Sequence, residues 1–145
     1  NGKRMFSAGK CVVCHRFQGT GGLCGPDLGS VANRFSIRDI VVSICEPSET
    51  IAEQYQANIV TLTHGSSVFG RILSRDDREL VVASNAYDFG DVTRAPIDQV
   101  EKGEPATTSM MPPATIGMMN EQEVRDLVAY LLSGGNRRHK MFQTR

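Results

Sequence analysis

The most constraining feature of the sequence is a short run near its start, Cys11-Val12-Val13-Cys14-His15. This C-x-x-C-H spacing is typical of covalent haem attachment. Each of the two thiols can form a thioether with a haem vinyl group, and the histidine beside them can place a ring nitrogen on the iron. The run therefore predicts a haem c with a covalently fixed proximal ligand.

Other uses of paired cysteines need a different context. A closed zinc site needs four ligands, and a thioredoxin-like redox motif needs a strand before it and a helix after it. The sequence has no second C-x-x-C and no H-x-x-x-H, although Cys24 and Cys45 supply two more thiols. Zinc binding and redox thiols stay as alternative interpretations of the pair taken alone.

The residues after the motif offer a hydrogen-bond partner for His15. A glycine-rich stretch leads into Gly25-Pro26-Asp27-Leu28. Proline removes a donor and fixes the backbone, so a carbonyl in this turn can accept from the second ring nitrogen of a ligating histidine. We expect the carbonyl of Pro26 to do so.

A second axial ligand is expected near the other end of the chain. The run 109–113, Ser-Met-Met-Pro-Pro, presents thioethers in a loop stiffened by proline, and methionine ligation raises the potential of a haem iron. Met111 is the favoured ligand. The alternatives are an open iron or another side chain, among them Met110, Met118, Met119, His64 and His139.

Apolar periodicity predicts two helices besides a first one through Phe6. Both stripes have the spacing i, i+3, i+4, i+7, with Ser36 and Asn120 as N-caps. The stripes are Ile37, Ile40, Val41 and Ile44, and Val124, Leu127, Val128 and Leu131.

Between residues 55 and 104 the pattern changes to short β-like runs. Four runs, at 56–62, 67–73, 79–83 and 91–97, are separated by turn residues, which predicts an antiparallel meander. Pro96 suits a sheet edge or the end of a strand.

In this order of motifs the chain resembles the class I cytochromes c, and most of all the Planctomycete/Verrucomicrobium-type haem-binding domain. The resemblance implies a mainly α, class I cytochrome c fold with a small antiparallel β-sheet inserted between the middle helix and the axial-methionine loop. It implies one domain over residues 1–145, with a helical haem core at 1–54 and 105–140 and the β insertion at 55–104. Further resembling positions are Gly2, Phe6, Arg34, Ser43, Pro47, Ser48, Ile51 and 130–135.

Carried over to this sequence, the resemblance implies a role for each site residue. Cys11 and Cys14 are the thioether sites, His15 the proximal ligand, Pro26 its partner and Met111 the distal ligand. It also implies that the first and last helices cross, with Gly2 and Phe6 against Leu127 and Tyr130.

The function implied is electron transfer by one covalent haem c with His/Met ligation, outside the cytoplasm. We expect a module of, or a shuttle for, a larger periplasmic oxidoreductase, with a redox protein or a fused dehydrogenase-like domain as partner. No nucleophile, general base or substrate pocket is recognisable beyond the haem, so we do not expect an enzyme in its own right. The alternative is a gas sensor or peroxidase with an open or displaceable distal site.

Charge and hydropathy exclude other partners. The 16 basic and 16 acidic side chains balance, so the charge predicts neither a nucleic-acid-binding surface nor a polybasic membrane anchor. No apolar run has the length of a membrane span.

The two remaining cysteines need their own explanation. Haem c is attached in compartments where disulfides persist, so the leftover pair predicts a bridge between Cys24 and Cys45. Two buried thiols that act as small hydrophobic side chains are the alternative.

Overall fold

The structure, a computed structural model, describes residues 1–143. It divides into two compact units, which we name the helical unit, Asn1–Glu49 with Pro112–Arg145, and the sheet unit, Thr50–Met111. The sheet unit thus interrupts the helical unit in sequence. Among the described helices, none has the length and apolar character needed to cross a bilayer.

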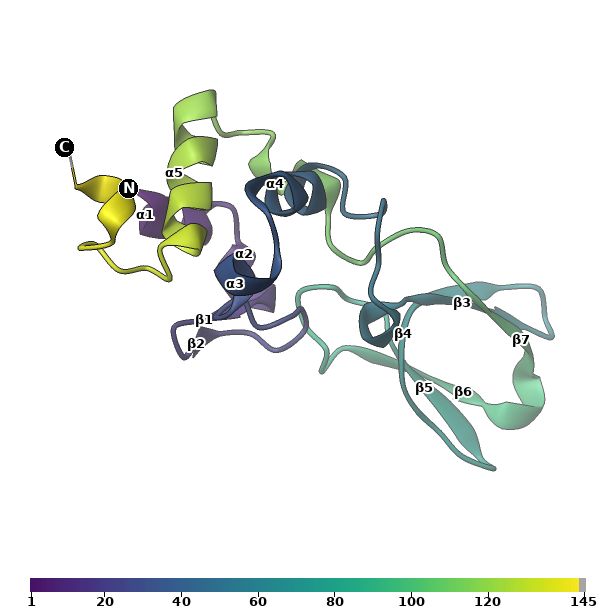
Figure 1. The fold of residues 1–145 in the computed structure, drawn as a ribbon. Helices are drawn as coiled ribbons and strands as arrows, with labels where there is room; N and C mark the ends of the chain where they lie inside the picture. The colour runs from purple at the N-terminus through teal and green to yellow at the C-terminus, as the bar shows by residue number, and fades with distance from the viewer. Residues whose placement is uncertain (144–145) are drawn as a thin grey trace. The chain divides into compact units, whose positions relative to one another are not determined.

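The helical unit holds every α-helix found in residues 1–143, together with one small hairpin (Figure 1). Its elements are α1 (Gly2–Ala8), α2 (Cys11–Cys14), β1 (Arg16–Phe17), β2 (Thr20–Gly21), α3 (Val31–Arg34), α4 (Ile37–Cys45), η3 (Pro113–Ile116), α5 (Glu121–Leu132) and η4 (Lys140–Phe142).

The two longest helices begin where the sequence predicts. The side chains of Ser36 and Asn120 each accept a hydrogen bond from the backbone N–H three residues on, and the carboxylates of Asp39 and Glu123 accept one from the backbone N–H of the cap residue. These capping boxes satisfy backbone donors that a helix start otherwise leaves without a partner. The predicted starts of α4 and α5 are therefore confirmed.

Replacing Asn120 by alanine removes the cap of α5, and we expect a loss of about 1 kcal/mol in the free energy of unfolding. Urea unfolding followed by circular dichroism measures it. Asn120→Ser keeps an acceptor at the cap and should retain most of the stability. Equal losses in both variants would contradict the role of the side-chain cap.

Helices α1 and α5 pack closely against each other at Gly2. A Cβ atom built on Gly2 would lie 2.1 Å from the backbone oxygen of Asp126 and 2.5 Å from Cβ of Tyr130. The Phe6 ring lies 6.0 Å from the Tyr130 ring between centroids. The predicted crossing of the first and last helices is confirmed.

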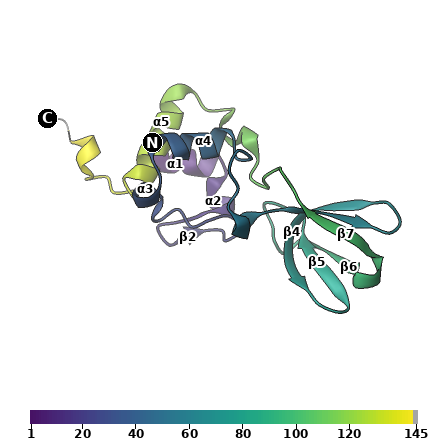
Figure 2. The same cartoon turned by 45° about the vertical axis from the view of Figure 1, so that its right-hand side comes forward.

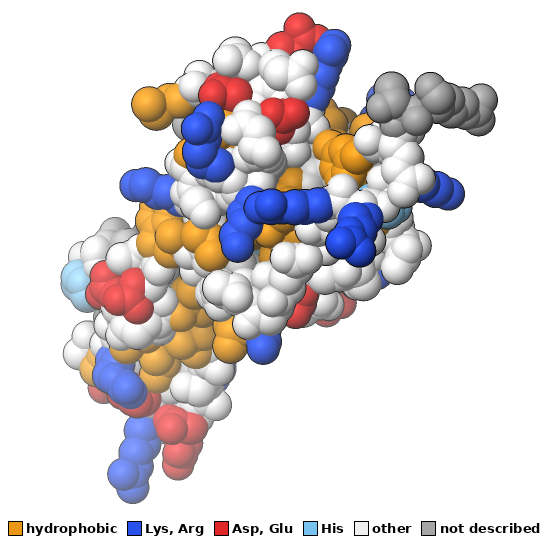
Figure 3. Space-filling view, turned by 90° about the vertical axis from the view of Figure 1, so that its left-hand side faces the viewer, with side chains coloured by type: hydrophobic (Ala, Val, Ile, Leu, Met, Phe, Trp, Pro, Cys, Tyr) orange, Lys and Arg blue, Asp and Glu red, His pale blue; other side chains and the backbone are white. Residues whose placement is uncertain are grey.

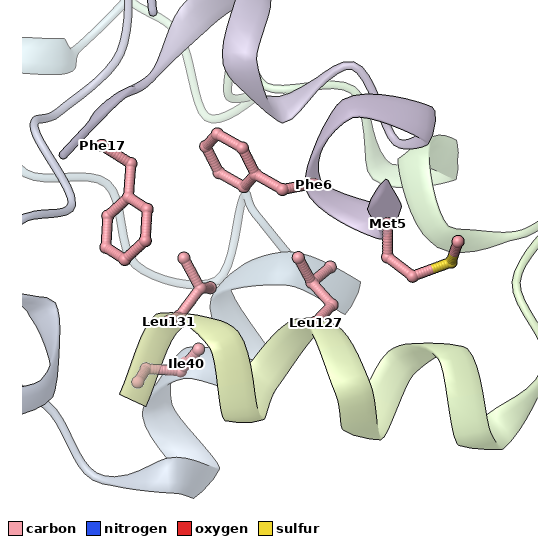
Figure 4. Close-up of a cluster of buried hydrophobic side chains, with 6 residues drawn as sticks. All are labelled: Met5, Phe6, Phe17, Ile40, Leu127 and Leu131. Carbon is pink, nitrogen blue, oxygen red and sulfur yellow. The ribbon is translucent and has the colours of Figure 1, made fainter. Parts of the chain in front are cut away.

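The core of the helical unit forms where these helices meet the hairpin (Figure 4). Phe6 and Phe17 contact each other with ring centroids 5.7 Å apart, and Tyr130 covers both rings. Residues far apart in sequence are thereby held together, and Cys11 and Val12 of α2 pack against them. The buried set is Met5, Phe6, Phe17, Ile40, Leu127 and Leu131.

The sheet unit is a five-stranded antiparallel sheet, whose long hairpins stand out in Figure 2. Its elements are η1 (Glu53–Tyr55), β3 (Asn58–Leu62), β4 (Ser67–Arg75), β5 (Glu79–Ala83), β6 (Val92–Pro96), η2 (Ile97–Gln99) and β7 (Val100–Pro105). The strand order is β6-β5-β4-β3-β7. One face carries a separate core of Val60, Leu62, Leu80, Val82 and Ala95.

The four predicted strands form the meander β3 to β6, and β7 was not predicted. Its sequence is charged and contains Gly103 and Pro105, because it is an edge strand that pairs only with β3. Exposed edges favour charge and proline over the apolar alternation that marks inner strands. Pro96 ends β6, the other edge, as its sequence position suggests.

The expected mainly α, class I cytochrome c fold is wrong for this chain. The structure is 33% helical and 24% strand, with the five-stranded sheet as a major element. Two physical reasons account for the difference. The helices α2 and α3 are single turns of four residues, and the sheet has a hydrophobic core of its own instead of serving as a small addition to a helical one.

Candidate haem-binding site

The helix α2 carries the two thiols of the motif. Its N-cap, Lys10, adopts the left-handed conformation at φ 57°, which turns the chain out of α1 and into this single helical turn. Cys11 and Cys14 then stand three positions apart, a spacing that puts side chains on the same side of a helix. His15 leaves the turn in an extended conformation, with φ −106° and ψ 133°. The two thiols are therefore carried by a helical turn, whereas the imidazole is carried by extended backbone.

The hairpin β1–β2 reverses the chain directly after the motif. Its turn residues Gln18 and Gly19 have φ of 52° and 75°, the positive values that tight two-residue hairpins need. The side-chain amide of Gln18 also donates to the carbonyl of Gly134, 2.5 Å away. The turn is therefore fixed to the segment that follows α5.

The returning chain, residues 21–26, runs back along α2 at backbone contact distance. Gly22 N–H donates to the carbonyl of Val12 at 3.0 Å, and Gly25 N–H to that of Cys14 at 2.8 Å. A Cβ on Gly22 would lie only 1.8 Å from the Val13 oxygen. Glycine is required here because the two backbones touch.

The His15 ring lies against Gly25 and Pro26 of this returning segment. Its Nδ1 lies 2.8 Å from the carbonyl oxygen of Pro26. Since a carbonyl only accepts, the proton is on Nδ1, and Nε2 keeps a lone pair for a metal. A Cβ on Gly25 would meet the ring at 2.7 Å from Cε1, 2.9 Å from Nδ1 and 3.2 Å from Nε2. The ring therefore fills a space that only glycine leaves open.

The protonation states around the motif suit covalent attachment and ligation. Burial lowers the pKa of His15, against the opposing effect of the Pro26 hydrogen bond, so the neutral, ligating imidazole is favoured. Burial raises the pKa of the Cys11 and Cys14 thiols, and the neighbouring Cys24 raises that of Cys14 further. The two thiols are accordingly kept as S–H groups.

The other predicted site residues are placed as follows. Met111 is the last residue of the sheet unit, directly before Pro112, and its backbone N–H donates to the Ser109 hydroxyl at 3.1 Å. Cys24 lies in the returning segment beside the motif, and Cys45 ends α4 and is exposed. The Cys24–Cys45 bridge stays a prediction.

The alternative ligands have their own surroundings. Met119 packs against the core of the helical unit, with its terminal carbon 2.8 Å from a Cβ built on Gly9, and Met118 is exposed. His64 contacts the Ser66 hydroxyl in a turn of the sheet unit, and His139 caps η4. Within residues 1–143 no group of three or more His, Cys, Asp or Glu side chains is arranged to hold a metal ion.

Sequence reasoning missed the parts played by Gly25 and Gln18. The sequence pattern places Gly25 in a turn, whereas the structure shows that its missing side chain makes room for the His15 ring. A glycine directly before the expected histidine partner was the available signal. Nothing in the sequence pointed to Gln18, whose amide reaches a carbonyl 116 positions away.

The family follows from a comparison with known protein families. The family model for cytochrome c matches residues 1–83, which is more than half of the chain and includes the motif, the returning segment and α4. The chain belongs to the cytochrome c family. Membership of this family implies that this cytochrome c carries a covalently bound haem c and takes part in haem-based electron transfer. No curated protein matches it in sequence.

The residues present fit the haem that the family implies. Two S–H groups stand on one helical turn, and the neighbouring imidazole has its proton fixed on Nδ1 and its Nε2 lone pair available. Apolar side chains close to the motif are left exposed, Val13 at 40% and Leu23 at 74%. Both the donor set and the uncovered apolar surface suit a porphyrin.

Proposed function

We propose that this cytochrome c transfers single electrons through one haem c, held by Cys11 and Cys14 and ligated by His15 and Met111. The observation that supports the proposal is the contact between His15 Nδ1 and the Pro26 carbonyl, which orients the imidazole that directly follows the two thiols in the sequence. Support for Met111 comes from its position before Pro112 and from a backbone fixed by the Ser109 hydroxyl.

The bound haem supplies reversible one-electron chemistry at iron, and the chain's residues set the conditions for it. His15 is fixed in one tautomer, because the Pro26 carbonyl accepts its Nδ1 proton; this makes Nε2 a stronger donor. The thioethers of Cys11 and Cys14 keep the group from dissociating. The apolar side chains Val13 and Leu23 would give the bound haem a less polar environment, which disfavours the more highly charged ferric state.

Met111→Ala tests the distal ligand, with Met110→Ala as the matched control. We expect Met111→Ala to lose the absorption band of the methionine-to-ferric-iron bond, to bind carbon monoxide quickly and to have a lower reduction potential. Met110→Ala should behave as the wild type. Wild-type protein without that band and with rapid carbon monoxide binding would instead establish a sensor or peroxidase site. Loss of haem colour on denaturation would contradict covalent attachment.

The balance of charge over the whole chain hides a difference between its units. The helical unit carries 11 of the 16 Lys and Arg residues and 7 of the 16 Asp and Glu residues, and the sheet unit carries 5 and 9. Basic side chains gather over α1 and the segment after α5, where Lys3, Arg4 and Arg137 border one hollow (Figure 3). A redox partner with an acidic surface suits the unit that holds the haem motif.

This charge difference predicts how small electron acceptors react. Oxidation by ferricyanide, an anion, should slow several-fold as ionic strength rises from 10 mM to 500 mM, because salt screens its attraction to the helical unit. Oxidation by neutral benzoquinone should change little. Stopped-flow absorbance measures both rates, and equal salt dependence would contradict electrostatic steering.

For its cellular setting, we propose a periplasmic module of, or shuttle for, a larger oxidoreductase. The support is the motif, whose haem is attached outside the cytoplasm, and the resemblance to the Planctomycete/Verrucomicrobium-type haem-binding domain in the residues given above. A redox protein or a fused dehydrogenase-like domain is the partner of this proposal.

A further inference from the structure

Cys24 lies against the haem-attachment motif, although haem binding has no use for a third thiol. The Gly25 N–H donates to the Cys14 carbonyl at 2.8 Å, and a Cβ on Gly22 would be 3.2 Å from Cα of Cys14. With standard backbone dimensions, that hydrogen bond keeps the Cα atoms of Cys14 and Cys24 within about 8 Å. Disulfides join cysteines whose Cα atoms are about 4.4–6.8 Å apart, so a small adjustment of the loop suffices.

The two motif thiols have different surroundings. The Sγ of Cys11 lies 3.8 Å from the Gly9 carbonyl, and this side chain packs against the core of the helical unit. Cys14 lies beside the segment that carries Cys24, since its carbonyl accepts the Gly25 N–H at 2.8 Å. Of the two, Cys14 is therefore the natural partner for Cys24.

We propose that, before haem is attached, Cys14 and Cys24 form a disulfide that withholds Cys14 from thioether formation. Only the consequence for attachment rests on the proposed function; the bond itself does not. The oxidant is a small-molecule or protein disulfide. One protein thiolate attacks it, forming a mixed disulfide and releasing one thiol. The second protein thiolate then attacks the mixed disulfide and releases the other. Two electrons pass to the reagent, and its two sulfurs leave as S–H groups.

The disulfide blocks attachment because thioether formation adds S–H across a vinyl double bond. Sulfur bonds to one carbon and the proton goes to the other, with no net oxidation. A sulfur already bonded to Cys24 has no S–H to add. A dithiol reductant restores both protein thiols and is itself oxidised to a disulfide. Haem attachment therefore depends on the balance of thiols and disulfides in the compartment.

The positions of Lys10, Arg16, Arg34, Arg38 and Arg71 make trypsin a direct reporter of pairing. Cleavage leaves Cys11 and Cys14 on peptide 11–16, Cys24 on 17–34 and Cys45 on 39–71. The full chain is produced without haem, oxidised with oxidised glutathione, alkylated, digested and mapped by mass spectrometry. We expect peptide 11–16 joined to 17–34 as the main cross-link, kept in Cys11→Ser and Cys45→Ser and lost in Cys14→Ser.

The outcomes separate this proposal from its competitors. A main cross-link within 11–16, or one between 17–34 and 39–71, would overturn it, the latter in favour of the Cys24–Cys45 bridge. In haem-attachment assays, oxidised wild type should gain haem several-fold more slowly than the same sample after dithiol reduction. If reduced protein attaches no haem while the expected cross-link forms, the proposed function fails and the disulfide stands.

Discussion

Gly25→Val is expected to abolish normal ligation of the haem by His15. Even a Cβ atom at this position lies 2.7–3.2 Å from three atoms of the imidazole ring, and valine adds two methyl groups beyond it. The ring cannot retreat and keep its 2.8 Å contact with the Pro26 carbonyl. We expect a several-fold lower yield of haem-loaded protein and, in what is recovered, a high-spin absorption spectrum and an altered reduction potential.

Two companion variants make the result specific to the ring. Gly25→Ala introduces the Cβ alone and should give an intermediate effect. Gly103→Ala, in β7, places its Cβ where no heavy atom lies within 4 Å, and should leave the spectrum as it is. A normal spectrum and potential in Gly25→Val would show that the His15 ring does not need this space.

Leu127→Ala is expected to have the largest effect on stability. Leu127 is 1% exposed and lies in the core that joins α5 to α1. Truncating a buried leucine to alanine costs about 2–5 kcal/mol, through lost burial and the cavity left behind. Because this core joins α5 to α1, we expect the methionine-to-iron absorption band and the helical signal to be lost together, at a lower urea concentration than in wild type, while the covalently bound haem keeps its colour.

Val82→Ala is the matched change in the other core. Val82 is fully buried in the sheet unit, among Val60, Leu62, Leu80 and Ala95. It should lower the stability of the sheet by about 1–3 kcal/mol and leave the haem spectrum of the folded protein unchanged. An equal effect of both variants on the haem signal would mean that the two cores unfold as one.

Local signals predict much of this protein, and long-range contacts account for what was missed. Ser36 and Asn120 predict the starts of α4 and α5, because a cap and the apolar stripe that follows it both lie within about a dozen positions of sequence. The strand β7 escaped prediction, because the residues of an edge strand resemble those of a charged loop. The fold class was wrong for a related reason: a resemblance to helical proteins does not report how large a core the intervening strands form.

The candidate site shows the same limit. Spacing alone identifies Cys11, Cys14 and His15 as chemically linked, because all three are neighbours in sequence. The space around the imidazole depends on Gly25, which returns to the motif only after the hairpin at Gln18 and Gly19 reverses the chain. The path by which the chain returns to the motif depends on the folded backbone and cannot be predicted from the sequence pattern alone.

The pairing of the first and last strands of the sheet unit has a consequence for the order of folding. Asn58 pairs with Pro105, and just outside them Ala106 N–H donates to the Ala57 carbonyl at 2.9 Å. Once this pair has formed, the contour between Glu49 and Pro112 shrinks from the whole sheet unit to two short tails. The loop that closes when α5 packs onto α1 runs from residue 9 to residue 120, and this pairing shortens it by less than half, so the entropic cost of closing it falls by about 0.5 kcal/mol. A sheet that forms early therefore speeds the packing of α5 onto α1 in the helical unit.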